Sequence, residues 1–319
     1  MKELREIRTT SKLALLLPFF SWVFLGALGA LAVHLDGASA SGAGEDGSLV
    51  RIGLVRSLFR DTSEPLMQVI MRPFKSLMEA QTGMSGQLVA AGEASNLAQR
   101  LKSGDCQLGI FHGFEFAWAR QIVPELKPLL IAVPKQQRRL FAHLVVRAES
   151  VSDRKVKSVA DLKGQVVALP YMSREHCRLF LERRCVPAGN SSAKFFSRIS
   201  VPRDATDAID DVIAGTTAAA VIDGDDLESY RSQYPEYFAK VKVLLQSEAF
   251  PCAVIAYYPG KLSQVLLDRF REGMLSAKDS RQARQVMQLC RISSFEDFPA
   301  DFDKMLDDIA KAYPPSASK

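Results

Sequence analysis

The stretch that decides the fold is SVADLKGQVVALPYMSREHCRLFLE, which spans Ser158–Glu182. Its β-branched run Gln165–Leu169 predicts a buried strand, and Pro170 ends that strand. A helical pattern begins directly after Ser173. Because the first N–H groups of a helix have no partner within it, this junction is either an ordinary capped turn or a site for an anion.

Length and composition place the chain among globular α/β proteins. It has 319 residues, of which 47% are hydrophobic and 24% are charged, and its formal net charge is +5. This length is enough for one large domain or two smaller lobes. The chain has no long run of Lys and Arg, so we expect no nucleic-acid partner. A mildly basic chain suits a small anionic ligand.

The chain has five cysteines, which we expect to be buried free thiols. None forms a C-x-x-C pair or stands at metal-ligand spacing from histidines, so we expect no metal and no cofactor. A bridge between Cys177 and Cys185 is the alternative if the helix ends before Cys185. The cysteines are Cys106, Cys177, Cys185, Cys252 and Cys290.

The N-terminus carries the pattern of an export signal. Basic residues up to Lys12 precede an apolar run, Leu13–Leu35, which is followed by the small residues Ala38–Ala40. We expect a signal peptide over residues 1–40, a linker over 41–48 and a periplasmic location. The alternative is an uncleaved helix that anchors the protein to the inner membrane, because the run Leu13–Leu35 is just long enough to span a bilayer.

Strand and helix patterns alternate after the linker, which predicts a mostly parallel, doubly wound sheet. The expected strands are Leu49–Val55, Gly86–Ala91, Gln107–Phe111 and Pro128–Val133. The expected helices are Thr62–Gln81, Ser95–Leu101 and Phe114–Arg120.

A long strand pattern, Leu140–Arg147, interrupts the alternation, and such a strand can leave one lobe and enter another. The second series has expected strands Gln165–Leu169, Ala193–Phe196, Ala218–Ile222, Lys240–Leu245 and Ala253–Tyr257, and helices 173–184, Ala205–Ala214 and Asp225–Tyr230. After Tyr257 we expect only helices, at Lys261–Ser276, Ser280–Leu289 and Asp301–Ala312.

Several blocks of the chain resemble one family, the extracytoplasmic solute-binding proteins of phosphate, phosphite and phosphonate ABC transporters. The blocks are GDCQLGIFHGFEFAWAR (104–120), HLVVRAES (143–150), SVADLKGQVVAL (158–169), DAIDDVIAGTTAAAVIDGDDL (207–227), AVIAYYPGKLSQVLLDRFREGML (253–275) and SFEDFPADFDKMLDDIAKAY (294–313). The resemblance implies a two-lobed α/β protein of the type II periplasmic-binding fold. Each lobe would be a mostly parallel sheet flanked by helices, with the ligand cleft between the lobes.

The resemblance also implies a division of the chain and two hinges. Residues 49–145 would form lobe 1, residues 146–248 lobe 2, residues 249–313 a return to lobe 1 with C-terminal helices, and residues 314–319 a tail. The lobes would close on the ligand by motion at Leu140–Arg147 and near Gln246–Cys252. A membrane permease would be the partner.

The family usually holds its ligand with a hydroxyl-rich turn, and this chain departs from that pattern. The corresponding turn reads Pro170-Tyr171-Met172-Ser173-Arg174, in which only Ser173 keeps a hydroxyl at the helix start. Where the family tends to have a His-Asp pair, this chain has Arg203-Asp204. Arg174 and Arg203 together would make an oxyanion cleft.

Candidate ligand-binding residues are those that follow strand ends, because doubly wound lobes bind ligands there. For several of them a purely structural role remains the alternative. Arg56 is a solvated loop residue in that case, His112 a capping or core residue, and Asp223 the N-cap of the following helix. The candidates are Arg56, Phe59, His112, Phe114, Glu115, Tyr171, Met172, Ser173, Arg174, Arg203 and Asp223.

The expected function is therefore a non-catalytic one, the binding of a small oxyanion such as phosphate, phosphite or a phosphonate. The chain has no G-x-S-x-G, H-E-x-x-H or phosphate-loop motif, which argues against an enzyme. The alternatives are a membrane-anchored ligand-sensing module of the same fold and a binding protein for another small solute, such as an organosulfur compound, an amino acid or a pyrimidine precursor.

Overall fold

The structure is a computed structural model, and it describes residues 49–59, 64–135, 137–152, 156–171 and 173–315. The expected signal peptide or anchor, with the run Leu13–Leu35, lies outside these residues. No helix among the described residues combines the length and the apolar character needed to cross a bilayer. All of the described residues belong to one compact unit, Gly47–Lys319.

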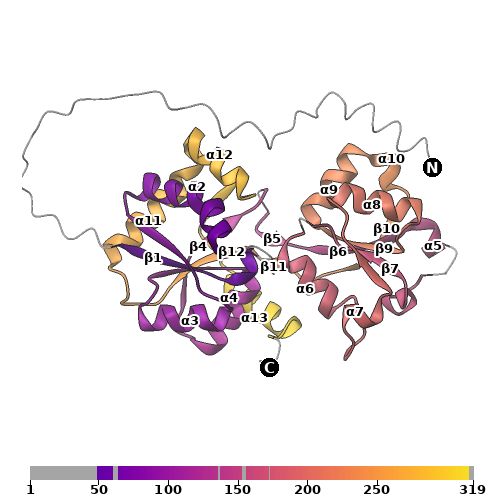
Figure 1. Cartoon of the computed structure of the whole chain (residues 1–319), viewed down its shortest axis with the longest axis horizontal. Helices are drawn as coiled ribbons and strands as arrows, with labels where there is room; N and C mark the ends of the chain where they lie inside the picture. The colour runs from indigo at the N-terminus through magenta and orange to yellow at the C-terminus, as the bar shows by residue number, and fades with distance from the viewer. Residues whose placement is uncertain (1–48, 60–63, 136, 153–155, 172, 316–319) are drawn as a thin grey trace, which may run out of the picture. The chain divides into compact units, whose positions relative to one another are not determined.

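Two separate sheets with helices on both faces organise this unit (Figure 1). The first sheet has six strands, which follow one another in space as β13 (Ser294–Glu296), β4 (Lys127–Val133), β12 (Ala253–Tyr257), β3 (Leu108–Phe111), β1 (Val50–Leu54) and β2 (Gly86–Ala90). The second has five, in the order β10 (Val241–Gln246), β6 (Ala142–Arg147), β9 (Ala219–Asp223), β7 (Val166–Ala168) and β8 (Arg198–Ser200).

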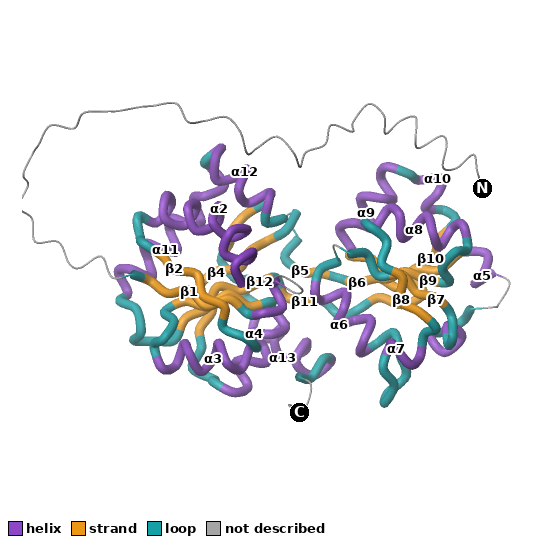
Figure 2. The backbone as a smooth tube through the Cα atoms, viewed as in Figure 1, coloured by secondary structure: helices purple, strands orange, loops and turns teal. Residues whose placement is uncertain are grey.

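Helices cover both faces of each sheet (Figure 2). Those that pack with the first sheet are α2 (Glu64–Thr82), α3 (Ala94–Ser103), α4 (Gly113–Ile122), α11 (Gln264–Ser276), α12 (Arg281–Leu289) and α13 (Phe302–Ala312). Those near the second are α5 (Ala148–Ser152), α6 (Glu175–Arg183), α7 (Ser192–Phe195), α8 (Ala205–Ala214), α9 (Gly224–Gln233) and α10 (Pro235–Phe238). Three 3-10 turns complete the described fold: η1 (Arg56–Phe59), η2 (Val159–Leu162) and η3 (Ala277–Asp279).

The central strands of both sheets are buried, as their apolar sequences require. All five residues of β9 are buried, and so are four of the five in β1, where only Arg51 is exposed. Strands covered by helices on both faces read as continuous apolar runs, so these two were readily found in the sequence. Helix α3 ends at Gly104, whose φ of 89° is the left-handed conformation that a glycine adopts at little cost.

A small antiparallel sheet of two strands links the two halves. The predicted strand Leu140–Arg147 is in fact two strands, β5 (Arg139–Leu140) and β6, which are separated at Phe141. The short strand β5 pairs with β11 (Phe250–Pro251), and β6 continues into the second sheet. Both crossings between the sheets therefore run side by side (Figure 1).

The two-sheet α/β architecture confirms the expected fold class, but further details of the prediction were wrong. Ala193–Phe196 is not a strand, because Ser192–Phe195 forms the short helix α7. The chain after Tyr257 is not all helical, because Ser294–Glu296 forms strand β13. Neither sheet is mostly parallel. In the first sheet β12 inserts antiparallel between β3 and β4, and β13 is antiparallel to β4. In the second sheet β6 is antiparallel to both β9 and β10.

Candidate ligand-binding site

A cavity of about 370 Å³ opens at the carboxyl ends of β1 and β3, where doubly wound sheets bind their ligands. Elements of the first sheet form most of its wall, and the start of α6 from the second sheet completes it. Most of the lining side chains are apolar, including Leu54, Leu58, Phe59, Met71, Phe74, Ile110, Phe114, Leu140, Val254, Ile292 and Phe295.

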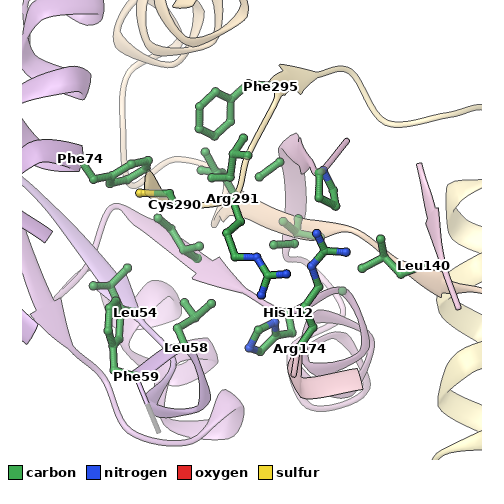
Figure 3. Close-up of a pocket in the computed structure, with 18 of the residues that line it drawn as sticks. Leu54, Leu58, Phe59, Phe74, His112, Leu140, Arg174, Cys290, Arg291 and Phe295 are labelled. Atoms are coloured by element: carbon green, nitrogen blue, oxygen red, sulfur yellow. The ribbon is translucent and has the colours of Figure 1, made fainter. Parts of the chain in front are cut away.

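The nitrogen-bearing side chains in this wall are His112, Arg174, His176 and Arg291. Among the described residues that line the cavity, none is acidic. Figure 3 shows the guanidinium groups of Arg174 and Arg291 close to the imidazole of His112, with Leu54, Leu58 and Phe59 on another side. The cavity thus has one basic end, at Arg174, Arg291 and His112, which we call the basic pole, and otherwise mainly apolar walls.

Arg174, at the N-cap of α6, is held by two buried carboxylates of the second sheet. Its Nη1 lies 3.1 Å from Asp223 Oδ2 and 3.0 Å from Asp225 Oδ2. Burial alone lowers the pKa of Arg174, but Asp223, Asp225 and Asp226 together raise it by more, so the guanidinium stays charged. Since the contacts to Asp223 and Asp225 all use Nη1, the side chain keeps Nε and Nη2 as donors for an anion.

Asp223 is the last residue of β9 and serves as the N-cap of α9. Its Oδ1 accepts a hydrogen bond of 2.9 Å from the backbone N–H of Asp225. Burial raises the pKa of Asp223, and Arg174 opposes this shift without cancelling it. The structure therefore gives Asp223 the capping role that the sequence left open, and adds an ion pair that fixes Arg174.

His176, in the first turn of α6, contacts the strand crossings. Its Nε2 lies 3.3 Å from the carbonyl oxygen of Phe141, and its ring centroid lies 5.3 Å from that of Phe250. Burial lowers the pKa of His176 to about 3, so the imidazole is neutral at physiological pH. Sequence reasoning did not select this residue, since its role depends on β5 and β11.

Asp226 of α9 joins the two halves of the protein through two ion pairs. Lys135, which follows β4, places Nζ 3.2 Å from Asp226 Oδ1, and Arg291, which follows α12, places Nη2 3.5 Å from Asp226 Oδ2. Sequence reasoning selected neither residue: Arg291 follows a helix, and Lys135 was passed over although it follows the predicted strand Pro128–Val133.

The structure brings four of the predicted residues to this cavity: Phe59, His112, Phe114 and Arg174. His112 is the N-cap of α4, and its ring stacks on Phe114 with a centroid distance of 5.6 Å and an interplanar angle of 3°. Phe114 also meets Phe250 of β11 edge-on at 6.0 Å. Phe114 therefore forms an aromatic part of the cavity wall.

Two further predicted residues, Arg56 and Glu115, line a different, more polar cavity of about 620 Å³. Glu115 is buried and accepts hydrogen bonds of 2.8 and 2.7 Å from the Ser57 hydroxyl on its two oxygens. Burial raises its pKa from 4.5 to about 7, against the opposing effect of the Ser57 hydrogen bond. Phe114 lies between the two cavities and lines both.

The turn that opens α6 differs from the expectation. The helix begins at Glu175 with Arg174 as its N-cap, so Ser173 does not cap it. The backbone N–H of Ser173 bonds to Pro170 O at 3.0 Å, and that of Tyr171 to Pro202 O at 2.8 Å. Two amides of the turn are therefore already satisfied within the protein. Met172 lies outside the described residues.

The remaining predicted residues do not line the apolar cavity, although Asp223 contacts Arg174. Tyr171 has 66% of its surface exposed. Ser173 and Asp223 line a small cavity of about 270 Å³ beside α8 and α9. Arg203 is exposed and pairs with Asp204 at 3.2 Å and Asp207 at 3.5 Å. Among the described residues, no contact joins Arg203 to Arg174.

One group of side chains has the donor types of a metal site. Donor atoms of His176, Cys177 and Asp223 lie within 4.8 Å of one another, and all three residues are buried. However, Asp223 already pairs with Arg174 and accepts from the Asp225 amide, and burial raises the pKa of the Cys177 thiol. A cation would have to compete with a fixed guanidinium, so we assign this group no metal.

Two helix-covered sheets, paired crossing strands and a cavity lined from both halves define a two-lobed solute-binding protein. The chain belongs to the family of periplasmic substrate-binding proteins of phosphonate ABC transporters, whose sequence model matches residues 58–302. Members of this family bind solutes for transport and are not enzymes. A comparison with curated protein sequences gave no match.

Solved structures share the fold at low sequence identity. A protein from Xanthomonas citri, solved with ATP, is 15% identical with a TM-score of 0.55, over 83% of this chain and 97% of that one. A phosphonate-transporter binding protein from Pseudomonas aeruginosa is 15% identical with a TM-score of 0.50, over 86% and 91%. PhnD1 from Prochlorococcus marinus with methylphosphonate is 12% identical with a TM-score of 0.51, over 83% and 98%.

Proposed function

We propose that this protein is the periplasmic solute-binding component of an ABC transporter, and that it binds a phosphonate or a related small oxyanion at the basic pole. The observation that carries the proposal is the set of nitrogen bases, Arg174, Arg291 and His112, at one end of a cavity that lies at strand ends. An arginine fork matches the oxygens of a phosphonate, and the N-cap position of Arg174 places the positive end of α6 nearby.

Fixed donors at the basic pole support this ligand class. Arg174 is oriented by Asp223 and Asp225 before any ligand arrives, so little side-chain entropy is lost when an anion binds. The nearby carboxylates balance the charge of Arg174 and Arg291, which favours a reversible site over a very tight one. Reversible binding is what a transport protein needs, because the solute must pass on to the permease.

Closure of the two halves would act through the paired crossings β5 and β11. Each crossing is only two residues long, and His176 and Phe114 both contact Phe250 there. We infer that bending at these strands brings Arg174 of the second half toward His112 of the first. The division of the chain into lobes at residues 145 and 248, which follows from the family resemblance, is part of this proposal.

The N-terminal pattern supports export to the periplasm, with a membrane permease as partner. Two forms are consistent with it, a secreted protein cleaved after Ala40 and a sensor module that keeps Leu13–Leu35 as an anchor. The length of this apolar run is the observation that favours the second form. Mass spectrometry of the N-terminus of the exported protein distinguishes them, since only the secreted form begins near Ser41.

The ligand class is tested by thermal unfolding of the exported protein with phosphate, phosphite, alkylphosphonates, sulfonates and amino acids. A ligand at about 100 times its Kd adds about 2.7 kcal/mol to the free energy of unfolding, which gives a clear shift of the midpoint. We expect shifts with phosphonates, and loss of these shifts in Arg174→Gln but not in Arg203→Gln. If no phosphorus oxyanion shifts the midpoint, the proposed ligand class is wrong.

A further inference from the structure

We propose that the solute carries a sizeable apolar body, so that the preferred ligands are aryl- or longer alkylphosphonates rather than phosphate or methylphosphonate. This inference rests on the proposed function, since it assumes an anionic head group at the basic pole. It extends the proposed function to the part of the ligand beyond the head group, whose chemistry we infer from the walls of the cavity.

The size of the cavity is the first argument. It holds about 370 Å³, within the range of roughly 300–1,000 Å³ that is usual for small-molecule sites. A water molecule takes about 30 Å³ in the liquid, so a small oxyanion at the basic pole would leave most of this space to water. A ligand that fills the cavity has to extend well beyond its head group.

The chemistry of the walls is the second argument. Away from the basic pole most of the lining side chains have no donor or acceptor, among them Leu54, Leu58, Phe59, Phe74 and Phe295, and the exceptions are His176 and Cys290. A hydroxyl or ammonium group on the ligand body would lose its water against the apolar side chains and find no partner among them. A hydrocarbon body instead releases water from both surfaces, so each buried methylene tightens binding by about fourfold.

The separation of polar and apolar lining is the third argument. In Figure 3 the labelled bases Arg174, Arg291 and His112 lie in the middle of the view, with Leu54, Leu58 and Phe59 to their left and Leu140 to their right. Phe114, which stacks on His112, adds an aromatic wall beside the basic pole. This arrangement matches an amphipathic anion that has its charge at one end.

The test is a calorimetric titration of the exported protein with a series of probes: phosphate, methyl-, butyl-, hexyl- and phenylphosphonate, and benzyl alcohol as a neutral counterpart of the aryl body. We expect hexyl- and phenylphosphonate to bind at least about tenfold more tightly than methylphosphonate, and benzyl alcohol to bind far more weakly than phenylphosphonate. Phosphate or methylphosphonate binding as tightly as phenylphosphonate overturns the inference but leaves the proposed function in place. Binding of no phosphonate at all overturns both.

A wall variant checks where the apolar body sits. Leu58→Asn should weaken phenylphosphonate by about tenfold while changing methylphosphonate by less than about twofold. The matched control is Leu66→Asn on α2, at a leucine that is 52% exposed and outside the cavity wall. The thermal midpoint of each variant shows that it folds. Equal weakening of both probes by Leu58→Asn would mean that the body lies elsewhere, and the inference would fail.

Discussion

Arg291 and Asp226 connect the two sheets of the protein, with Arg291 Nη2 lying 3.5 Å from Asp226 Oδ2. Lys135 contacts the same carboxylate from a different loop, at 3.2 Å. Among the described residues, Lys135 and Arg291 are the non-glycine residues with positive φ, at 43° and 57°. A left-handed backbone costs an L-residue roughly 1–2 kcal/mol, so the fold accepts strain at both positions where a cation meets Asp226.

The first prediction is that the contact of Lys135 and Arg291 with Asp226 slows the release of ligand. Lys135→Gln removes one charge from the contact while leaving the basic pole intact. Exposed ion pairs contribute about 0.2–1 kcal/mol, so we expect the dissociation rate of a bound phosphonate to rise by about 1.4- to fivefold. Stopped-flow measurement of the rate checks this.

The control for this variant is Lys127→Gln, at an exposed lysine that begins β4. It should dissociate ligand at the wild-type rate. The effect of Lys135→Gln should also shrink as salt is raised, because salt screens exposed charges. A wild-type rate in Lys135→Gln at low salt would show that the contact does not hold the two halves together.

The second prediction concerns Arg174, whose removal leaves the carboxylates of Asp223 and Asp225 buried without their partner. Breaking a buried ion pair in this way typically destabilises a protein by about 3–5 kcal/mol. We expect Arg174→Leu to lower the free energy of unfolding by this order at about pH 8, as measured by urea denaturation. Arg203→Leu, at an exposed residue, should change it little.

The pH dependence of this loss has a definite sign. Burial already raises the pKa of Asp223 and Asp225, and without Arg174 it would rise further. A carboxyl whose pKa is higher in the folded state favours folding while it is protonated, so the loss should shrink as the pH falls. Adding Asp223→Asn, which keeps a capping side chain, should restore part of the stability at high pH. A pH-independent loss would point to packing rather than charge.

Much of the fold could be predicted from local patterns, because the strands and helices that face the core carry them strongly. Helix Ala205–Ala214 and strand Ala253–Tyr257 have the predicted bounds. Ala193–Phe196 failed because four residues with two aromatics fit a strand and a helical turn equally well, and Ser191 takes the N-cap position without a capping bond from its side chain. Local patterns also could not show that β12 inserts between β3 and β4, since strand order depends on distant pairing.

The candidate site was only partly predictable for a related reason. Arg174 and His112 follow strands directly, so the rule that ligands bind at strand ends finds them. Arg291 follows a helix, and it reaches the cavity only because α12 packs against the first sheet. The Ser173 cap was wrong by one residue, which is a common difference at helix ends. The difference matters for the site, because the side chain at the start of α6 is then the guanidinium of Arg174 instead of the hydroxyl of Ser173.

The third prediction is that Glu115 makes the stability fall as the pH rises. Its pKa is about 7 in the folded protein against an ordinary value of 4.5, so the folded state holds this proton more tightly. The full stability is therefore present below about pH 4.5 and is lost as the pH rises to about 7. A tenfold difference in proton affinity corresponds to about 1.4 kcal/mol, so the loss is about 3 kcal/mol.

Glu115→Gln removes this titration while keeping an oxygen that can accept from Ser57. The variant should match the wild type below about pH 4.5 and exceed it by up to about 3 kcal/mol above pH 7, in urea denaturation at several pH values. Glu125→Gln, at an exposed glutamate, should show no such trend. A difference between Glu115→Gln and the wild type that does not change with pH would contradict the raised pKa.

The fourth prediction uses Cys290, which lies in the wall of the apolar cavity next to Arg291. All five cysteines are free, and Cys290 is half-buried while the other four are buried. We expect a maleimide to modify Cys290 first. Burial raises the pKa of this thiol, so the reaction should speed up as the pH rises and more thiolate forms.

Ligand in the cavity should cover this thiol. A saturating phosphonate that fills the cavity should slow the modification of Cys290 about tenfold or more. The thiol can react only while the cavity is empty, and at a ligand concentration of about 100 times Kd the cavity is empty for only about one hundredth of the time. Peptide mapping by mass spectrometry identifies the modified residue, and Cys290→Ser should lack the fast reaction. If the ligand binds by calorimetry but leaves the rate at Cys290 unchanged, it occupies another site, and the cavity is not where this protein holds its solute.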